Sequence, residues 1–199
     1  MLGEFYFKNE FLTPDECQMF IDYYDQNEAE AYRSKFRHPP YAEINLTMRI
    51  SKAVDVDKKN ELFAPIIKRV YDTVKSVNEE IFLFDVDWDY TMEQKKSVHV
   101  IKYDGTEKGF WGRHHHVNWI SNNKQFKLYA SIVLSSHKDY EGGDNIYFFG
   151  AHTDRPTPVE HRKQGILTLY PAFRGAQINP VLTGNKYTLD FLFEGPYWR

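Results

Sequence analysis

The sequence predicts a mainly β protein with N-terminal helices. Only two segments, both before residue 78, show the three- and four-residue apolar spacing of a helix. After residue 78, short runs rich in β-branched and aromatic residues alternate with turn sequences such as Asp104-Gly105 and Gly142–Asp144. No helix-length segment separates these runs. We therefore expect an antiparallel sandwich or jelly roll, with two helices packed on one sheet.

The N-terminal elements are expected in the following order. The triplet Phe5–Phe7 is typical of a short strand. A first helix should run from about Pro14 to Ala31, because Thr13 suits the N-cap and Glu16 can close a capping box. A second helix should run from about Lys59 to Val77, where apolar residues recur at helical spacing.

The remaining elements are expected to be strands. They are the runs 81–90, 97–103, 127–136, 144–150, 165–171 and 186–193. We find no internal repeat or linker. We therefore expect a single domain over 1–199, with helical support at about 13–78 and a jelly-roll core at about 80–199.

Composition excludes several classes of function. The 199 residues carry a formal net charge of −3, which argues against a broad nucleic-acid footprint. The single cysteine, Cys17, permits neither an internal disulfide nor a cysteine-based zinc site. We see no signal peptide and no apolar run long enough to span a membrane, so we expect no membrane partner and a cytoplasmic location.

Three consecutive histidines, in the stretch "GRHHHVNW", are the main candidate for chemistry. On a strand, His114 and His116 project to one face, and His116 and Asn118 form a second such pair. A non-haem Fe(II) site needs two histidines and one carboxylate, and neither pair supplies the carboxylate. The alternative interpretation is a polar turn with solvated or hydrogen-bonded histidines.

Other histidines offer weaker candidates. A literal His-x-Asp occurs at His152–Asp154, but it lies in a Pro-rich connection that we do not expect to form a strand. The next histidine, His161, lies in the same connection, so we interpret this match as a coincidence. His99 and His137 are expected to be structural residues.

Several ordered segments resemble the 2-oxoglutarate/Fe(II)-dependent dioxygenases, specifically the prolyl-4-hydroxylase-like branch in its short, phage-encoded form. These segments are "FLTPDEC", "YDGTEKGFWGRHHH", "KLYASIVLSSHKDYEGGDNIYFF", "GILTLYPAFRGAQINPV" and "TGNKYTLDFLFEGPYWR". The resemblance covers nearly the whole chain and is weakest from about Tyr32 to Lys58. It implies a double-stranded β-helix, which is a form of jelly roll.

The resemblance also assigns positions. It places the first metal histidine at His114, the family's aspartate at His116 and the distal histidine at Gln177. A register two residues later gives His116 and Asn118 instead. Gln177 supplies only a neutral amide, so Fe(II) binding would need a further contribution, such as bound 2-oxoglutarate or a nearby acid like Asp144.

The resemblance places three cosubstrate contacts as well. The basic residue for 2-oxoglutarate falls at Lys186, with Thr188 and Tyr103 as further contacts. The alternative for Lys186 is a solvated lysine at a strand end. The alternative interpretation of Gln177 is a polar core residue that is hydrogen-bonded within an emptied metal site.

The leading hypothesis is a dioxygenase-fold protein with a degraded metal site that acts as a binding or structural module. A phage virion or assembly component is the setting that the resemblance implies, in the host cytoplasm or the virion, with a protein partner or self-assembly. The second hypothesis is an active Fe(II)/2-oxoglutarate-dependent hydroxylase with an atypical His/His/Gln site. A third is a closed structural site for Zn or Ni.

Overall fold

The computed structural model describes residues 5–33, 36–38, 41–43, 48–94, 97–117, 124–148, 154–156 and 163–197. Three α-helices lie in these ranges: α1 (Pro14–Gln26), α2 (Ala64–Val77) and α3 (Trp88–Glu93). A 3₁₀ turn, η1 (Glu28–Glu30), follows α1, and a π-helical turn, η2 (Asn78–Phe82), follows α2. Within the described ranges, none of the helices has the length and apolar character needed to cross a bilayer.

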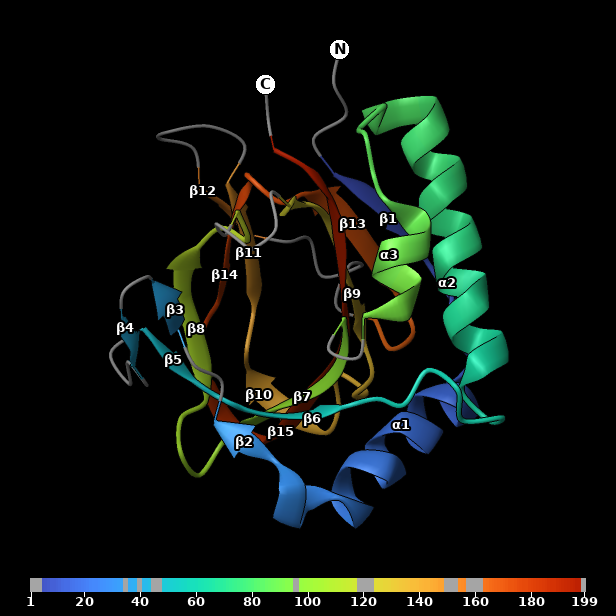
Figure 1. The fold of residues 1–199 in the computed structure, drawn as a ribbon. Helices are drawn as coiled ribbons and strands as arrows, with labels where there is room; N and C mark the ends of the chain where they lie inside the picture. The colour runs from blue at the N-terminus through green and yellow to red at the C-terminus, as the bar shows by residue number, and fades with distance from the viewer. Residues whose placement is uncertain are drawn as a thin grey trace.

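Two antiparallel sheets form the body of the molecule (Figure 1). The larger has the order β1-β13-β9-β15-β7-β6-β2, with β10 also paired to β15. Its strands are β1 (Tyr6–Lys8), β2 (Tyr32–Arg33), β6 (Lys52–Asp55), β7 (Val98–Asp104), β9 (Lys124–Val133), β10 (Tyr140–Gly142), β13 (Leu167–Pro171) and β15 (Val181–Pro196).

The smaller sheet has the order β12-β11-β14-β8-β5. Its strands are β5 (Arg49–Ile50), β8 (Phe110–His114), β11 (Asn145–Phe148), β12 (Asp154–Pro156) and β14 (Gly175–Ile178). A separate hairpin joins β3 (Phe36–His38) to β4 (Tyr41–Glu43). The expected mainly β jelly roll is confirmed.

Alternating residues divide the larger sheet into two faces. On β15, Tyr187, Leu189, Phe191 and Phe193 belong to the main hydrophobic core, together with the apolar faces of α1 and α2. Figure 1 shows both helices on the outside of this sheet. The intervening residues Lys186, Thr188 and Asp190 therefore face the interior between the two sheets, which we call the barrel interior.

The sequence correctly predicts the start of the first helix. Glu16 N donates to Thr13 Oγ1, and Thr13 N donates to the Glu16 carboxylate, which completes the capping box. The helix ends at Gln26, earlier than expected, because Asn27 caps it and its side chain donates to Tyr23 O at 2.7 Å. The second helix begins at Ala64, later than expected, after a turn around Asn60.

One strand prediction is wrong. The run 81–90 forms the end of η2, an irregular segment and α3. The Asn78 side chain forms two hydrogen bonds with the backbone of Phe84: Nδ2 donates to the carbonyl oxygen at 2.9 Å, and Oδ1 accepts from the backbone N at 3.0 Å. Asp87 then caps α3 by accepting from Tyr90 N at 3.0 Å. These local hydrogen bonds outweigh the β propensity of the aromatic residues.

Candidate functional site

The histidine cluster lies at the end of β8, in the smaller sheet. His114 is the last residue of β8 and lies opposite Ala176 of β14. The pairing is irregular between Ala176 and Ile178, so Gln177 lies at a bulge. The strand that carries His114 and the strand that carries Gln177 are therefore neighbours in the smaller sheet.

His114 is buried and held as a neutral ring. Its Nδ1 lies 2.7 Å from the Gly112 carbonyl oxygen, which can only accept, so Nδ1 carries the proton. The ring stacks on Trp111 with centroids 3.5 Å apart and planes at 4°. Burial lowers the pKa of His114 to about 3, and the Arg49 charge contributes to this shift. The ring is therefore uncharged at neutral pH.

His116 is equally enclosed. Its Nε2 lies 3.1 Å from Tyr170 Oη, and its ring stacks on Tyr129 with centroids 3.6 Å apart. Burial lowers its pKa well below the ordinary value, with contributions from His114 and Arg49. The His114 and His116 rings are 4.9 Å apart and perpendicular, at 89°.

Gln177 borders the same small cavity as His114. Its Nε2 donates to Asn179 Oδ1 at 2.9 Å, which leaves the amide oxygen as the Gln177 atom that could bind a metal. Thus the structure brings two predicted histidines together and places Gln177 beside one of them. Their role as metal ligands stays a prediction, and in the described ranges no three His, Cys, Asp or Glu residues gather as a metal-binding group.

The remaining candidates are Asn118, Asp144 and the residues of the Pro-rich connection. Asn118, His152 and His161 lie outside the described residues. Asp154 begins β12, so the expectation that this residue lies off a strand is wrong: pairing with β11 extends the smaller sheet to it. Asp144 does not border the cavity.

The two isolated histidines differ in their surroundings. His99 Nδ1 lies 2.9 Å from Asp55 Oδ1, and the Tyr32 hydroxyl donates to the same carboxylate. His137 is exposed.

All three predicted cosubstrate residues face the barrel interior. Lys186 is 1% exposed, so the alternative of a solvated strand-end lysine is wrong. Its Nζ donates to Gly143 O at 2.7 Å and to Asn145 Oδ1 at 2.6 Å. Tyr103 lies opposite Lys186 across the β7–β15 pairing, and Thr188 follows on the same face. Burial raises the pKa of Tyr103.

Sequence reasoning missed Arg49, which lies on β5 where the resemblance is weakest. Its guanidinium carbon lies 3.5 Å from the Trp111 ring centroid, and Nε donates to Ser51 Oγ at 2.7 Å. A cation stacked on an aromatic face is a stable arrangement. Arg49 thus places a permanent positive charge close to both buried histidines.

Asp190 was also missed. It is 3% exposed and accepts hydrogen bonds from the Tyr129 hydroxyl and from Ser131 Oγ. Burial raises its pKa. The position was detectable, because Asp190 lies four residues after Lys186 on the same face of the strand.

Aromatic side chains fill the space between these polar groups. Tyr129, Tyr147 and Tyr170 form a buried cluster. Phe5 covers it from the N-terminal side, with ring centroids 4.8 Å from Tyr147 and 5.2 Å from Tyr170. The cavity that remains, bordered by His114, Gln177 and these tyrosines, has a volume of about 20 Å³. That volume accommodates about one water molecule.

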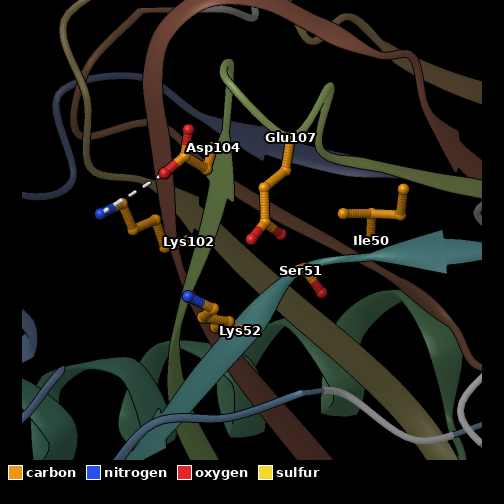
Figure 2. A pocket seen from close by; sticks show the side chains of 6 residues that line it. All are labelled: Ile50, Ser51, Lys52, Lys102, Asp104 and Glu107. Atoms are coloured by element: carbon orange, nitrogen blue, oxygen red, sulfur yellow. Dashed lines mark ion pairs between the residues drawn. The ribbon is translucent and has the colours of Figure 1, made fainter. Parts of the chain in front are cut away.

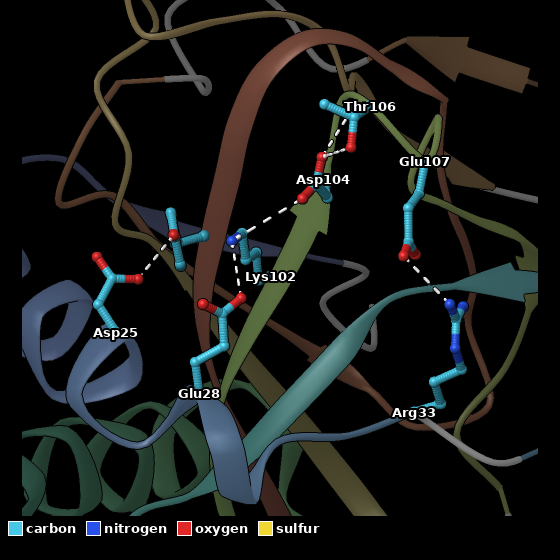
Figure 3. A network of polar contacts seen from close by, with 8 residues as sticks. Asp25, Glu28, Arg33, Lys102, Asp104, Thr106 and Glu107 are labelled. Atoms are coloured by element: carbon cyan, nitrogen blue, oxygen red, sulfur yellow. Dashed lines mark hydrogen bonds and ion pairs between the residues drawn. The ribbon is translucent and has the colours of Figure 1, made fainter.

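A charged network lies beside Ile50 and Ser51, the residues that follow Arg49 in sequence. Figure 2 shows a small pocket lined by Ile50, Ser51, Lys52, Lys102, Asp104 and Glu107. Figure 3 shows the surrounding ion pairs. Arg33 pairs with Glu107 at 3.1 Å, and Lys102 pairs with Glu28 at 3.1 Å. These contacts connect η1 and β2 to β7 and the turn after it.

His114, His116 and Gln177, the positions that the resemblance assigns to the metal, form a poor set of ligands for Fe(II). This set contains no carboxylate to offset the metal's charge, no group of three His, Cys, Asp or Glu gathers in the described ranges, and the amide of Gln177 is a weak ligand. Tyr170 engages the His116 Nε2, and the Arg49 guanidinium adds a like charge nearby. Burial is the main reason why the pKa of both histidines is low, and the Arg49 charge, which adds to this effect, would also repel a divalent cation.

The fold matches solved prolyl hydroxylases. A prolyl-4-hydroxylase from Pseudomonas putida matches with a TM-score of 0.71 at 14% identity, over 97% of this chain and 93% of that one. A prolyl hydroxylase from Trichoplax adhaerens, in complex with a hypoxia inducible factor peptide fragment, matches with a TM-score of 0.65 at 14% identity, over 95% and 82%.

A viral collagen prolyl hydroxylase from Paramecium Bursaria Chlorella virus-1, in complex with 2OG, has a TM-score of 0.61 at 12% identity and 97% coverage of both chains. No protein-family profile and no curated protein matches the sequence. The chain therefore has the prolyl-4-hydroxylase-like dioxygenase fold.

Proposed function

We propose that this protein is a non-catalytic binding or structural module built on the prolyl-4-hydroxylase-like fold. The observation that carries the proposal is the combination of side chains at the metal positions: His114, His116 and Gln177, with the Arg49 guanidinium beside them. A catalytic Fe(II) site of this fold class needs a carboxylate and open coordination positions. Here the position that the resemblance assigns to the carboxylate holds the neutral His116, and the Arg49 guanidinium lies close enough to lower the pKa of that histidine further.

The second support is the way in which the polar groups satisfy one another. His116 pairs with Tyr170, Gln177 with Asn179, and Lys186 with two oxygen atoms of the protein. A cosubstrate would have to displace the oxygen partners of Lys186, and the present cavity of about 20 Å³ has no room for a molecule the size of 2-oxoglutarate.

The module would act through its outer surface. A protein partner or a second copy of the chain is the proposed ligand, and the formal net charge of −3 favours such a partner over nucleic acid.

The second candidate function is an active hydroxylase. The perpendicular histidine rings, 4.9 Å apart, favour it because two imidazoles that share a metal can adopt such an arrangement. In that case Fe(II) and 2-oxoglutarate would be the cofactors, with His114, His116 and Gln177 as ligands and Lys186 and Thr188 at the cosubstrate.

The test is cosubstrate turnover under catalytic conditions. Purified untagged protein, supplied with Fe(II), ascorbate and 2-oxoglutarate in air, should form no succinate above a protein-free control. Succinate formation that disappears in His114→Ala but persists in the exposed variant His115→Ala would establish the hydroxylase and refute the proposed function. A stoichiometric Zn or Ni content would instead support a closed structural site.

A further inference from the structure

Strand β1 is a short strand at the edge of the larger sheet. Among the described strands it pairs only with β13, and the pairing joins three residues, Tyr6–Lys8. Figure 1 shows β1 beside β13 at this edge. Three residue pairs supply few backbone hydrogen bonds, so side-chain packing has to supply much of the attachment.

The aromatic side chains of β1 provide that packing. Phe5 and Phe7 lie two residues apart and therefore on the same face. The Phe5 ring centroid lies 4.8 Å from Tyr147 and 5.2 Å from Tyr170, and the Phe7 centroid lies 5.9 Å from Tyr147. Tyr6 packs against the main core on the opposite face. We call the free side of β13, together with Tyr147 and Tyr170, the β1-binding edge.

The turn after β1 is strained, and the chain is anchored beyond it. Glu10 has a φ of +51°, a left-handed conformation that disfavours residues with a side chain. Phe11 and Leu12 follow and are buried, and their backbone N–H groups donate to Gly165 O at 2.9 and 3.1 Å. Glu10 therefore separates a fixed anchor from a weakly held strand. A short strained hinge of this kind favours exchange of the strand between copies.

A second copy of the chain is the occupant that suits the β1-binding edge. A free peptide would have to displace a strand that its own chain holds at an effective concentration on the order of millimolar. In a reciprocal exchange each copy donates one β1 and receives one, so neither edge stays empty. The packing contacts are the same before and after the exchange, and opening of the turn releases the strain at Glu10.

We propose that two copies of this chain exchange their β1 strands, so that Phe5 and Phe7 of one copy pack on Tyr147 and Tyr170 of the other. The dimer is symmetric, because each copy plays both roles. Tyr147 and Tyr170 also border the small interior cavity, so each copy completes the wall of the other copy's interior. The inference rests on the proposed function, since it takes a second copy as the ligand of the module, and it names the segment that makes the contact.

A cross-strand disulfide records which chain supplies β1. Phe7 lies opposite Thr168, and opposite residues of antiparallel strands have Cα atoms about 4.5–5.5 Å apart, which suits a disulfide. In Phe7→Cys/Thr168→Cys, oxidation in EDTA joins the two strands within one chain of a monomer and between chains of an exchanged dimer. Non-reducing gel electrophoresis separates these products, and the natural Cys17 is buried. We expect an interchain product whose fraction rises with protein concentration.

Two substitutions at the hinge should shift the equilibrium in opposite directions. Glu10→Pro fixes φ at about −65°, which the closed turn does not allow, so it should lower the dimer dissociation constant at least about tenfold. Glu10→Gly accepts the left-handed conformation without strain, so it should raise this constant at least about tenfold, because two turns open in each dimer. Size-exclusion chromatography with light scattering measures both constants on chains that keep Phe7 and Thr168.

Lys108→Pro is the matched control. Lys108 is also exposed and has a φ of +54°, but it lies in the turn after β7, far from β1 in sequence. The substitution introduces the same conflict at a position where no strand can be exchanged. It should lower Tm and leave the dimer dissociation constant unchanged.

An intrachain disulfide alone at every protein concentration, with the natural hinge and with Glu10→Pro, would overturn the inference. A dimer that Glu10→Gly and Glu10→Pro form equally would overturn it too, because that dimer would not use this hinge. Where Glu10→Pro fails to fold, the natural hinge and Glu10→Gly still give the comparison.

The proposed function and this inference fail separately. Succinate formation would refute the proposed function, whereas the disulfide pattern is measured in EDTA without cosubstrate. Absence of strand exchange would overturn the inference and leave the module with a different protein partner.

Discussion

Acid should destabilise this protein because it buries two neutral histidines. His114 has a pKa lowered to about 3, and that of His116 lies well below its usual range, both chiefly through burial. In the unfolded chain each histidine titrates near its ordinary value. The unfolded state therefore binds more protons below about pH 6.5, and stability that is complete above this pH is lost as pH falls toward the folded-state values.

The magnitude follows from the unfolded pKa alone. Consider a histidine that stays neutral in the folded protein at pH 5 and titrates near 6.5 in the unfolded chain. It makes the free energy of unfolding about 2 kcal/mol lower at pH 5 than at pH 8. Two such histidines give about 4 kcal/mol, a large part of the stability of a typical domain.

The assay is urea unfolding at pH 8, 7, 6 and 5 in EDTA. His114→Asn retains an amide donor for the Gly112 carbonyl and removes the titration. Between pH 8 and pH 5, the free energy of unfolding of this variant should fall by about 2 kcal/mol less than that of the wild type. The exposed control His137→Asn should behave as the wild type. An equal loss in His114→Asn and the wild type would refute the assignment of a buried neutral His114.

Three further predictions concern other buried groups. Burial lowers the pKa of Lys58 to about 8. The free energy of unfolding should therefore rise with pH from about 8 toward the ordinary lysine value near 10.4, because the unfolded chain binds more protons in this range. Urea unfolding should show that Lys58→Met loses this pH dependence and that the exposed control Lys59→Met keeps it. Gly165 has a φ of +79°, and an added Cβ would lie 2.1 Å from Leu12 O. Gly165→Ala should therefore lower the free energy of unfolding by at least about 2 kcal/mol in the same assay. A smaller decrease than that of Gly112→Ala would contradict the geometry. Tyr170→Phe removes the partner of His116 Nε2 and should cost about 1–2 kcal/mol; an unchanged urea midpoint would argue against that hydrogen bond.

Local signals in the sequence predict much of the fold. Thr13 and Glu16 form the expected capping box, and the alternation on β15 correctly separates its core face from Lys186 and Thr188. The residues 81–90 show the limit of this reasoning, because Asn78 and Asp87 bind the backbone locally and override the strand pattern. β propensity is weaker than such specific hydrogen bonds.

The site was only partly predictable. His114 and His116 lie close together, as expected, but not through spacing on a strand, because β8 ends at His114 and His116 lies beyond it. Arg49 could not be assigned in the same way, because its role depends on the pairing of β5 with β8, which lie far apart in sequence. The bulge at Gln177 likewise depends on the register of β14 against β8. The position of Asp190, in contrast, follows from the alternation of side chains along β15.

The most direct test of the central claim is an anaerobic Fe(II) titration of the metal-free protein, followed by isothermal calorimetry. It is run beside a variant that restores the carboxylate and the distal histidine, His116→Asp with Gln177→His. We predict no saturable Fe(II) binding below about 100 μM for the natural chain, and binding at least tenfold tighter for the double variant. Micromolar or tighter stoichiometric Fe(II) binding by the natural chain would contradict the account.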